Sequence, residues 1–226
     1  MRLRALSLCL LTMLPGALGA EGRGTLGVGR LFSNDFFGDG HDRWRTGSYA
    51  LSIVRGEGWD GAPPDRPGPL LEWRLRTEII APVALNGPRA VDRPYATSLS
   101  LGLHAHWRAL GGEAAAGADL VVAGPQTGLG EFMDRAHERL GAQDIDDAVL
   151  DGQVGNGIHP TLLASWARSM RLSPALTLRP FAELQWGAED LARAGADVIL
   201  GGAAQDALWL RDVPSGQLYQ GIEGST

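Results

Sequence analysis

Hydrophobic and polar positions alternate with a period of two over long stretches of the chain. Between Leu71 and Ile79 the odd positions are mostly apolar, and the even positions are all charged. The same period is clear from Tyr95 to Trp107 and from Leu178 to Trp186. It predicts β-strands that each have one apolar and one polar face. Weaker versions of the pattern cover residues 25–32, 46–55, 117–124, 158–168, 193–201 and 206–211.

The length of these segments distinguishes two all-β architectures. A strand that crosses a membrane needs about 9–11 residues, and its polar face lines a wet lumen. The three clear segments have at least this length, and Glu72, Arg74, Arg76 and Glu78 stack charges on one face. Strands of a soluble periplasmic sandwich also alternate, but length and stacked charge favour the membrane. We therefore predict an all-β protein, an antiparallel transmembrane β-barrel, in which about nine or ten strands are readable.

The N-terminus has the pattern of an export signal. Arg2 and Arg4 precede a short apolar stretch that ends in small residues at 17–20, as in a secretory signal peptide. We expect residues 1–20 to be removed and residues 21–226 to form one barrel domain in the outer membrane. The only cysteine, Cys9, lies in the signal segment, so thiol chemistry is excluded from the mature domain.

Composition narrows the classes further. The 226 residues carry a net charge of −6 and no lysine, which argues against a nucleic-acid partner that needs a broad basic face. After the N-terminus no apolar run is long enough for a membrane-spanning helix. The last residues, Glu223 to Thr226, lack the terminal aromatic residue usual in outer-membrane barrels. We expect either a C-terminally truncated product or a barrel closed by strands that the pattern does not reveal.

If the first strand rises from the periplasm, three loops meet at the extracellular end, which we call the rim. They are Ser33–Trp44, Ala81–Pro94 and Pro125–Gly157. Within the third, the pattern predicts a short helix over Gly130–Leu140. The Pro- and Gly-rich segment Gly56–Pro69 falls at the opposite, periplasmic end.

Residues with useful chemistry gather in the rim loops. Asn34 and Asp35 lie in the first, Arg93 in the second and His137 on the predicted helix, and Thr46 begins the second strand facing the lumen. Each alone is ordinary turn or surface chemistry. Together they suit a hydrolytic site, because a neutral histidine can activate water and Asn and Asp oxygens are ligands for calcium.

No other constellation is stronger. The chain has no Gly-x-Ser-x-Gly elbow and no His-Glu-x-x-His zinc motif. His104 and His106 are alternate residues of a strand and are expected to face the lumen. Gly27 and Gly29 lie in a strand, without the strand-to-helix turn that a dinucleotide site requires.

Several motifs together resemble one known family. The stretch Phe32 to Asp35, then Thr46-Gly47, then Asp92 to Ala96, then Gly124-Pro125 and Gly130-Glu131 before His137, resembles the outer-membrane lipid A 3′-O-deacylases of the LpxR type. The resemblance runs from about Leu26 to Leu210. It implies a barrel of about twelve strands and calcium-dependent hydrolysis of the ester that holds the 3′-acyloxyacyl chain of lipid A.

The resemblance also implies roles and partners. His137 would activate water, Asn34 and Thr46 would build the oxyanion side, and Asp35 would bind calcium. Because the chain has no lysine, an arginine such as Arg93 or Arg74 would supply the positive charge that the family takes from lysine. The implied partners are lipid A or lipopolysaccharide and the outer membrane, with the protein a monomer.

Two departures keep alternatives open. Met133 stands where the family has glutamine, one helical turn before the histidine, and Gln143 stands about where the family has a carboxylate, with Asp144, Asp146 and Asp147 nearby. A catalytically degenerate relative, a small pore or structural barrel, and a soluble periplasmic β-domain are the alternatives to an active deacylase.

Overall fold

The computed structural model describes residues 22–34, 44–85, 92–141, 145–201 and 206–224. Strands dominate these residues, with two short α-helices and one 3-10 turn between the fifth and sixth strands. The elements are β1 Gly24–Asn34, β2 Trp44–Gly56, β3 Leu70–Ala81, β4 Ala96–Ala109, β5 Gly112–Ala123, η1 Pro125–Thr127, α2 Leu129–Leu140, α3 Asp147–Asp151, β6 Gly157–Ala167, β7 Met170–Ser173, β8 Leu176–Trp186, β9 Leu191–Leu200, β10 Leu208–Arg211 and β11 Leu218–Ile222.

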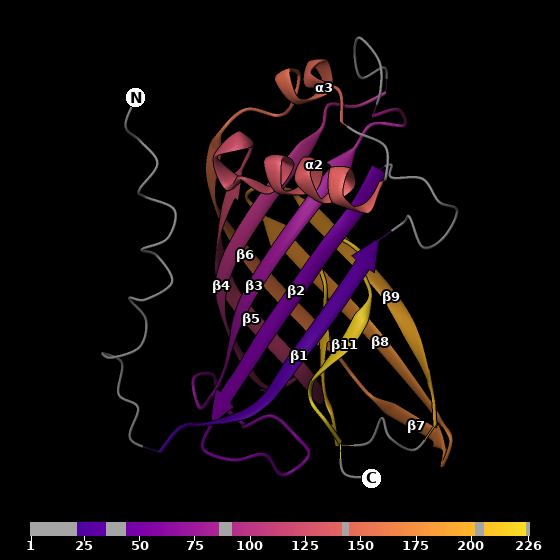
Figure 1. Ribbon diagram of the computed structural model, residues 1–226. Coiled ribbons are helices and arrows are strands. Elements are labelled where there is room, and N and C mark those ends of the chain that lie inside the picture. Colours follow the sequence, from indigo (N-terminus) through magenta and orange to yellow (C-terminus); the bar gives the residue numbers. More distant parts are fainter. Residues whose placement is uncertain (1–21, 35–43, 86–91, 142–144, 202–205, 225–226) are drawn as a thin grey trace.

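The strands form one large antiparallel sheet that follows chain order. β1 to β6 pair in sequence, β6 pairs with β8, and both β7 and β9 pair with β8, which gives nine strands in all. The sheet curls around a central space, and β8 and β9 face β1 and β2 across it (Figure 1). The predicted antiparallel all-β barrel architecture is therefore confirmed, in the form of a curled half-barrel.

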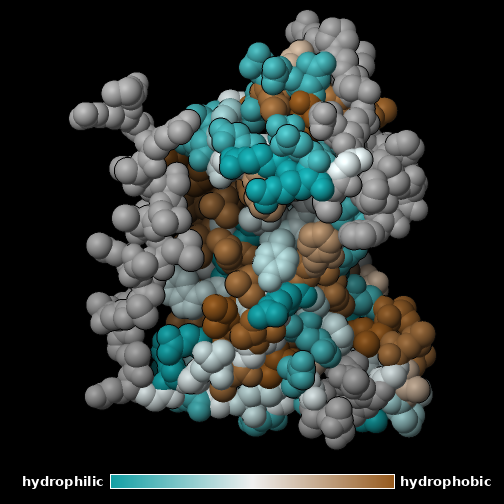
Figure 2. All heavy atoms as spheres, in the orientation of Figure 1, coloured by the Kyte–Doolittle hydropathy of each residue, from teal (hydrophilic) through white to brown (hydrophobic). Residues whose placement is uncertain are grey.

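Alternation along the strands sorts side chains to the two faces as predicted. On β3, Glu72, Arg74 and Glu78 are buried in the curl, while Leu75 between them is exposed on the outside. On β8, Leu184 and Trp186 are exposed to 60% and 68%. Figure 2 shows hydrophobic side chains over the strands below α2, and mostly hydrophilic ones on the helix itself. The inner face of β3 thus carries charged side chains, and the outside of the curl carries large apolar side chains.

No helix in the described part of the chain combines the length and the apolar character needed to cross a membrane.

A two-stranded hairpin, β10–β11, lies inside the curl. Its strands pair only with each other, and β11 contacts β1 and β2. The sequence pattern predicted β10 within 206–211, whereas no alternation marked β11. The hairpin and the inner wall share one apolar core, formed by Ala50, Val54, Leu70, Leu208, Leu210, Tyr219 and Ile222.

The two ends of the half-barrel differ. The helices lie at the end where β1, β3 and β5 finish (Figure 1), and α2 confirms the helix predicted at 130–140. At the other end the segment 57–69 folds back onto β4, where Arg108 donates through its backbone N–H to Pro64 at 2.7 Å. The Arg108 side chain also binds Asp65 at 2.9 Å.

Candidate functional site

Asn34 and Thr46 come together at the rim end of β1 and β2. Asn34 is the last residue of β1 and lies opposite Gly47, the residue after Thr46. A Cβ atom on Gly47 would lie 3.9 Å from the Asn34 amide nitrogen. Thr46 is only 2% exposed and belongs to the inner face. The strand pairing therefore places Asn34 one register position from Thr46 at the rim end of the two strands.

A β-bulge lies directly at this position. The register of β2 against β3 shifts between Trp44 and Gly47, so β2 contains one residue more than β3 there. Bulges re-aim side chains and are common at barrel rims and beside active sites. Here the bulge falls on Arg45 and Thr46, neighbours that would point to opposite faces in a regular strand.

Arg45 is a rim cation that the sequence analysis missed. Its guanidinium forms an ion pair with the buried Glu78 on β3 and reaches Glu189, in the β8–β9 turn, at 3.1 Å. Arg45 thus joins the β2–β3 wall to the opposite wall, directly beside Thr46. The absence of lysine was a signal that an arginine could take this place, but the bulge that positions Arg45 is not visible in the sequence.

The two arginines proposed from the sequence lie elsewhere. Arg74 is buried, and its Nε atom lies 2.7 Å from the Glu72 carboxylate. It lies opposite Ser52 in the strand register, and Ser52 is about 20 Å along β2 from Thr46 at the usual rise per residue. It is therefore not part of the rim. Arg93 is exposed before β4 and binds the neighbouring Asp92 at 2.9 Å.

Asp92 closes the β3–β4 connection. Its carboxylate accepts a hydrogen bond from the Val83 backbone N–H at 3.1 Å. This N–H, together with the Arg93 guanidinium, holds the pKa of Asp92 below its usual value. The Asp92-Arg93 pair thus fixes the loop, which is the turn chemistry that its sequence also suggested.

Helix α2 carries His137 on its inward face. Gly130, Met133 and His137 are spaced by three and four residues and share that face, and His137 is only 5% exposed. Met133 packs against an apolar cluster at the rim. Gly130 faces Tyr95, because a Cβ atom at position 130 would lie 3.7 Å from the tyrosine ring. The residues of this cluster are Ile79, Ala81, Leu85, Tyr95, Ile145 and Val149.

The loops on either side of α2 are attached to the strands by backbone hydrogen bonds. Gly124 donates to Thr97 at 2.9 Å before the helix, and Val154 donates to Tyr95 at 2.8 Å after it. Asp146 donates to Leu85 at 2.9 Å and also caps α3 through its side chain. The segment that contains α2 is therefore attached to the β3–β4 end both before and after the helix.

The described residues include only some of the oxygen ligands expected for calcium. Asn34 and Thr46 supply oxygen donors of the kind that calcium takes. Asp35, the predicted metal ligand, lies outside the described residues, as do Gln143 and Asp144. Among the residues that the structure describes, no three His, Cys, Asp or Glu side chains come together in a metal-binding group.

The two remaining strand histidines face the lumen, as predicted. His104 lies 3.0 Å from Asp119, and His106 lies 2.9 Å from Glu72. Gly117 makes room for the His104 ring, since a Cβ there would come within 2.5 Å of it. These pairs lie deep in the wall and do not join the rim residues.

The curled sheet has the arrangement of a known protein structure. The solved structure of LpxR from Salmonella typhimurium superimposes with a TM-score of 0.63 at 23% sequence identity. The fold is that of LpxR. The match covers 78% of this chain and 64% of the LpxR chain, so this chain spans a little under two thirds of LpxR. No family model and no curated protein matches the sequence.

Proposed function

We propose that the chain is an outer-membrane enzyme that hydrolyses the 3′-acyloxyacyl ester of lipid A. The observation that carries this proposal is the rim: on an LpxR fold, Asn34 and Thr46 are adjacent on β1 and β2, and His137 is buried on a helix fixed at the same end. The apolar outer face supports a membrane location, where an ester of the outer leaflet would lie beside this rim.

In the proposed reaction the His137 imidazole takes a proton from water while the water oxygen attacks the ester carbonyl. The Thr46 hydroxyl and the Asn34 amide donate hydrogen bonds to the oxyanion that develops. When the intermediate collapses, the bond between the acyl carbon and the ester oxygen breaks, and that oxygen stays on the sugar and takes the proton from the imidazolium. The products are a carboxylic acid and a free sugar hydroxyl.

Two features of the proposed site concern charge. Calcium, held by Asp35 with oxygen donors such as Asn34, would polarise the ester carbonyl. Arg45 extends the set of residues proposed from the sequence: it is beside Thr46 at the rim, whereas Arg93 binds Asp92 and Arg74 is buried far down the lumen. We assign the positive charge near the site to Arg45 in the first place and keep Arg93 as the second candidate.

A catalytically degenerate relative is the second candidate function, and Met133 favours it. Its side chain packs into the apolar rim cluster rather than offering a polar group one turn before His137. A simple pore is disfavoured by the hairpin that lies inside the curl.

The direct test uses purified protein, lipid A in detergent micelles and water enriched in ¹⁸O. Hydrolysis by attack at the carbonyl places one ¹⁸O atom in the released fatty acid, and chelation of calcium should stop the release. A folded protein that releases no fatty acid with calcium present supports the degenerate relative and contradicts the enzyme.

A further inference from the structure

The β10–β11 hairpin is held inside the curl by contacts on two opposite walls. On one side β11 lies against β1, where Gly27 and Gly29 leave space for it. A Cβ on Gly27 would lie 2.1 Å from the Gly221 carbonyl oxygen, and one on Gly29 would lie 2.5 Å from that of Gln220. The backbones of β1 and β11 therefore touch face to face, which any larger side chain would prevent.

A polar cluster, the front latch, ties β11 to this wall. It consists of Ser52, Glu72 and Tyr219. The Tyr219 and Ser52 hydroxyl oxygens are 2.9 Å apart, and Ser52 donates to Glu72 at 2.5 Å. All three side chains are buried, and Glu72 also binds Arg74 and His106. Burial makes these hydrogen bonds costly to lose, since the groups left behind would have no water partner.

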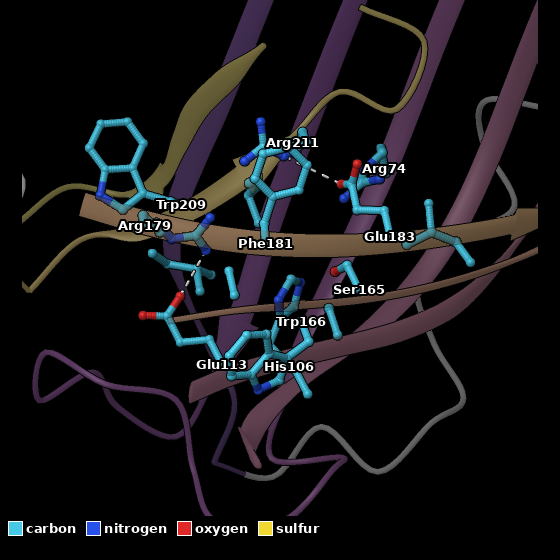
Figure 3. Close-up of a pocket in the computed structure, with 16 residues that line it drawn as sticks. Arg74, His106, Glu113, Ser165, Trp166, Arg179, Phe181, Glu183, Trp209 and Arg211 are labelled. Atoms are coloured by element: carbon cyan, nitrogen blue, oxygen red, sulfur yellow. Dashed lines mark hydrogen bonds and ion pairs between the residues drawn. The ribbon is translucent and has the colours of Figure 1, made fainter. Parts of the chain in front are cut away.

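A second cluster, the back latch, ties β10 to the opposite wall. Arg211 forms ion pairs with Asp197 on β9 and Glu183 on β8, and its guanidinium lies 3.6 Å from the centre of the Phe181 ring. Figure 3 shows Arg211 reaching from the hairpin to Glu183, with the Phe181 ring beneath it. Arg211 is only 9% exposed. The hairpin thus spans the lumen from β1–β3 to β8–β9.

Little open space is left between the hairpin and the wall behind it. The cavity there has a volume of ≈ 40 Å³ and is lined by β10 together with residues of β3 to β6 and β8. This is room for only a few water molecules. The charges around it are paired with one another, as in Arg179 with Glu113 at 3.0 Å and Arg211 with Glu183 at 3.5 Å (Figure 3). The charged side chains that line this cavity already have partners, so they would not replace the hydration shell of an ion.

We propose that the β10–β11 hairpin is a lumen plug: it seals the half-barrel against ions beneath the rim, and breaking either latch opens an ion-conducting path. The proposal does not depend on deacylase activity, because it rests on the fold and on the contacts of the hairpin alone.

The test is the conductance of the full chain in planar lipid bilayers. The unmodified protein should be silent. Arg211→Ala removes the back latch and leaves Asp197 and Glu183 facing the lumen, so conductance should rise at least about ten-fold with cation preference. Arg171→Ala, the same substitution at an exposed position on β7, should stay silent.

A reversible lock distinguishes an opened plug from a misfolded protein. Ser33 and Gln217 are hydrogen-bonded at 3.1 Å between β1 and the hairpin turn, so cysteines at both sites can be joined by a short reducible cross-linker. This cross-link holds the hairpin to the front wall, so it is used in a Cys9→Ser background in which Ser52→Ala and Tyr219→Phe break the front latch. Cross-linking should silence that channel, and reduction should restore it.

Three results would overturn the proposal. They are conductance in the unmodified protein, silence in both latch variants once they are folded, or a conductance in the front-latch variant that the cross-linker leaves unchanged.

Discussion

The hydroxyl oxygens of Ser52 and Tyr219 lie 2.9 Å apart although 167 residues separate them in the chain. Ser52 belongs to the barrel wall and Tyr219 to the inner hairpin, so this contact joins the two parts of the fold. Thr46 lies on the same strand as Ser52, β2, closer to the rim. The hairpin therefore supports from within the strands on which the proposed site is built.

The close approach of β11 to β1 makes Gly29 sensitive to any side chain. Gly29→Ala places a methyl group 2.5 Å from the Gln220 carbonyl, and the overlap should lower the free energy of unfolding by about 1–3 kcal/mol. Urea titration of the protein in lipid vesicles measures this. Gly24→Ala, at a position with open space around it, is the matched control, and an equal loss there would show that the hairpin contact is not the cause.

His137 should be needed for activity but not for folding. His137→Gln removes the imidazole that takes the proton from water, so deacylation should fall by at least about 100-fold. Heat-modifiable migration on gels should stay that of the folded barrel. His159→Gln, at an exposed position near the rim end of β6, should keep full activity; a comparable loss there would remove His137 from its proposed role.

Met133 should contribute to stability through the rim cluster. Met133→Ala withdraws a partly buried side chain from the contact with that cluster and should cost about 1–2 kcal/mol of unfolding free energy. Phe132→Ala, on the exposed face of the same helix, should cost less than about 0.5 kcal/mol. Equal effects in a denaturant titration would mean that α2 does not pack as described.

Arg45 has two partners of unequal importance. Arg45→Ala leaves Glu78 buried without its ion pair and should cost about 3 kcal/mol. Glu189→Gln breaks only the exposed half of the network and should cost less than about 1 kcal/mol. Denaturant titration of both variants checks the order, and a larger effect of Glu189→Gln would contradict it.

Asp92 should keep its negative charge to an unusually low pH. Since its pKa is lowered in the folded protein, the contact with Val83 is intact above the ordinary aspartate range and is lost only as the pH falls through the lowered value. Carbon-13 NMR of the Asp92 carboxyl group follows this titration. A midpoint for Asp92 at or above the ordinary aspartate value of about 3.9 would be inconsistent with the loop contact.

The strand pattern alone predicted most of the wall. Alternation was strongest on β3, β4 and β8, because each buries polar side chains on one face and exposes apolar ones on the other. The helix around His137 was also predicted. The short strands β7 and β11, of 4 and 5 residues, carry no alternation that would mark them, whereas β10 lies within the weak alternation over 206–211.

Contacts between segments that are far apart in the chain could not be predicted from the alternation. Gly27 and Gly29 lie against the backbone of β11, but nothing in the sequence names β11 as the segment that approaches them. Arg45 was missed because its position depends on a bulge, which shifts register without a sequence signal of its own. Asn34, Thr46 and His137 were predicted because motifs mark them, and the structure places all three at one end.

The most direct test of the central claim is the mass of lipid A from cells that express this chain, beside cells that express the His137→Ala variant at equal levels in the outer membrane. The proposed function predicts that the unmodified chain removes the mass of the 3′-acyloxyacyl group and that the variant leaves lipid A intact. Unchanged lipid A in both, with the protein folded in the outer membrane, would contradict the deacylase and leave a barrel that keeps the fold without the reaction.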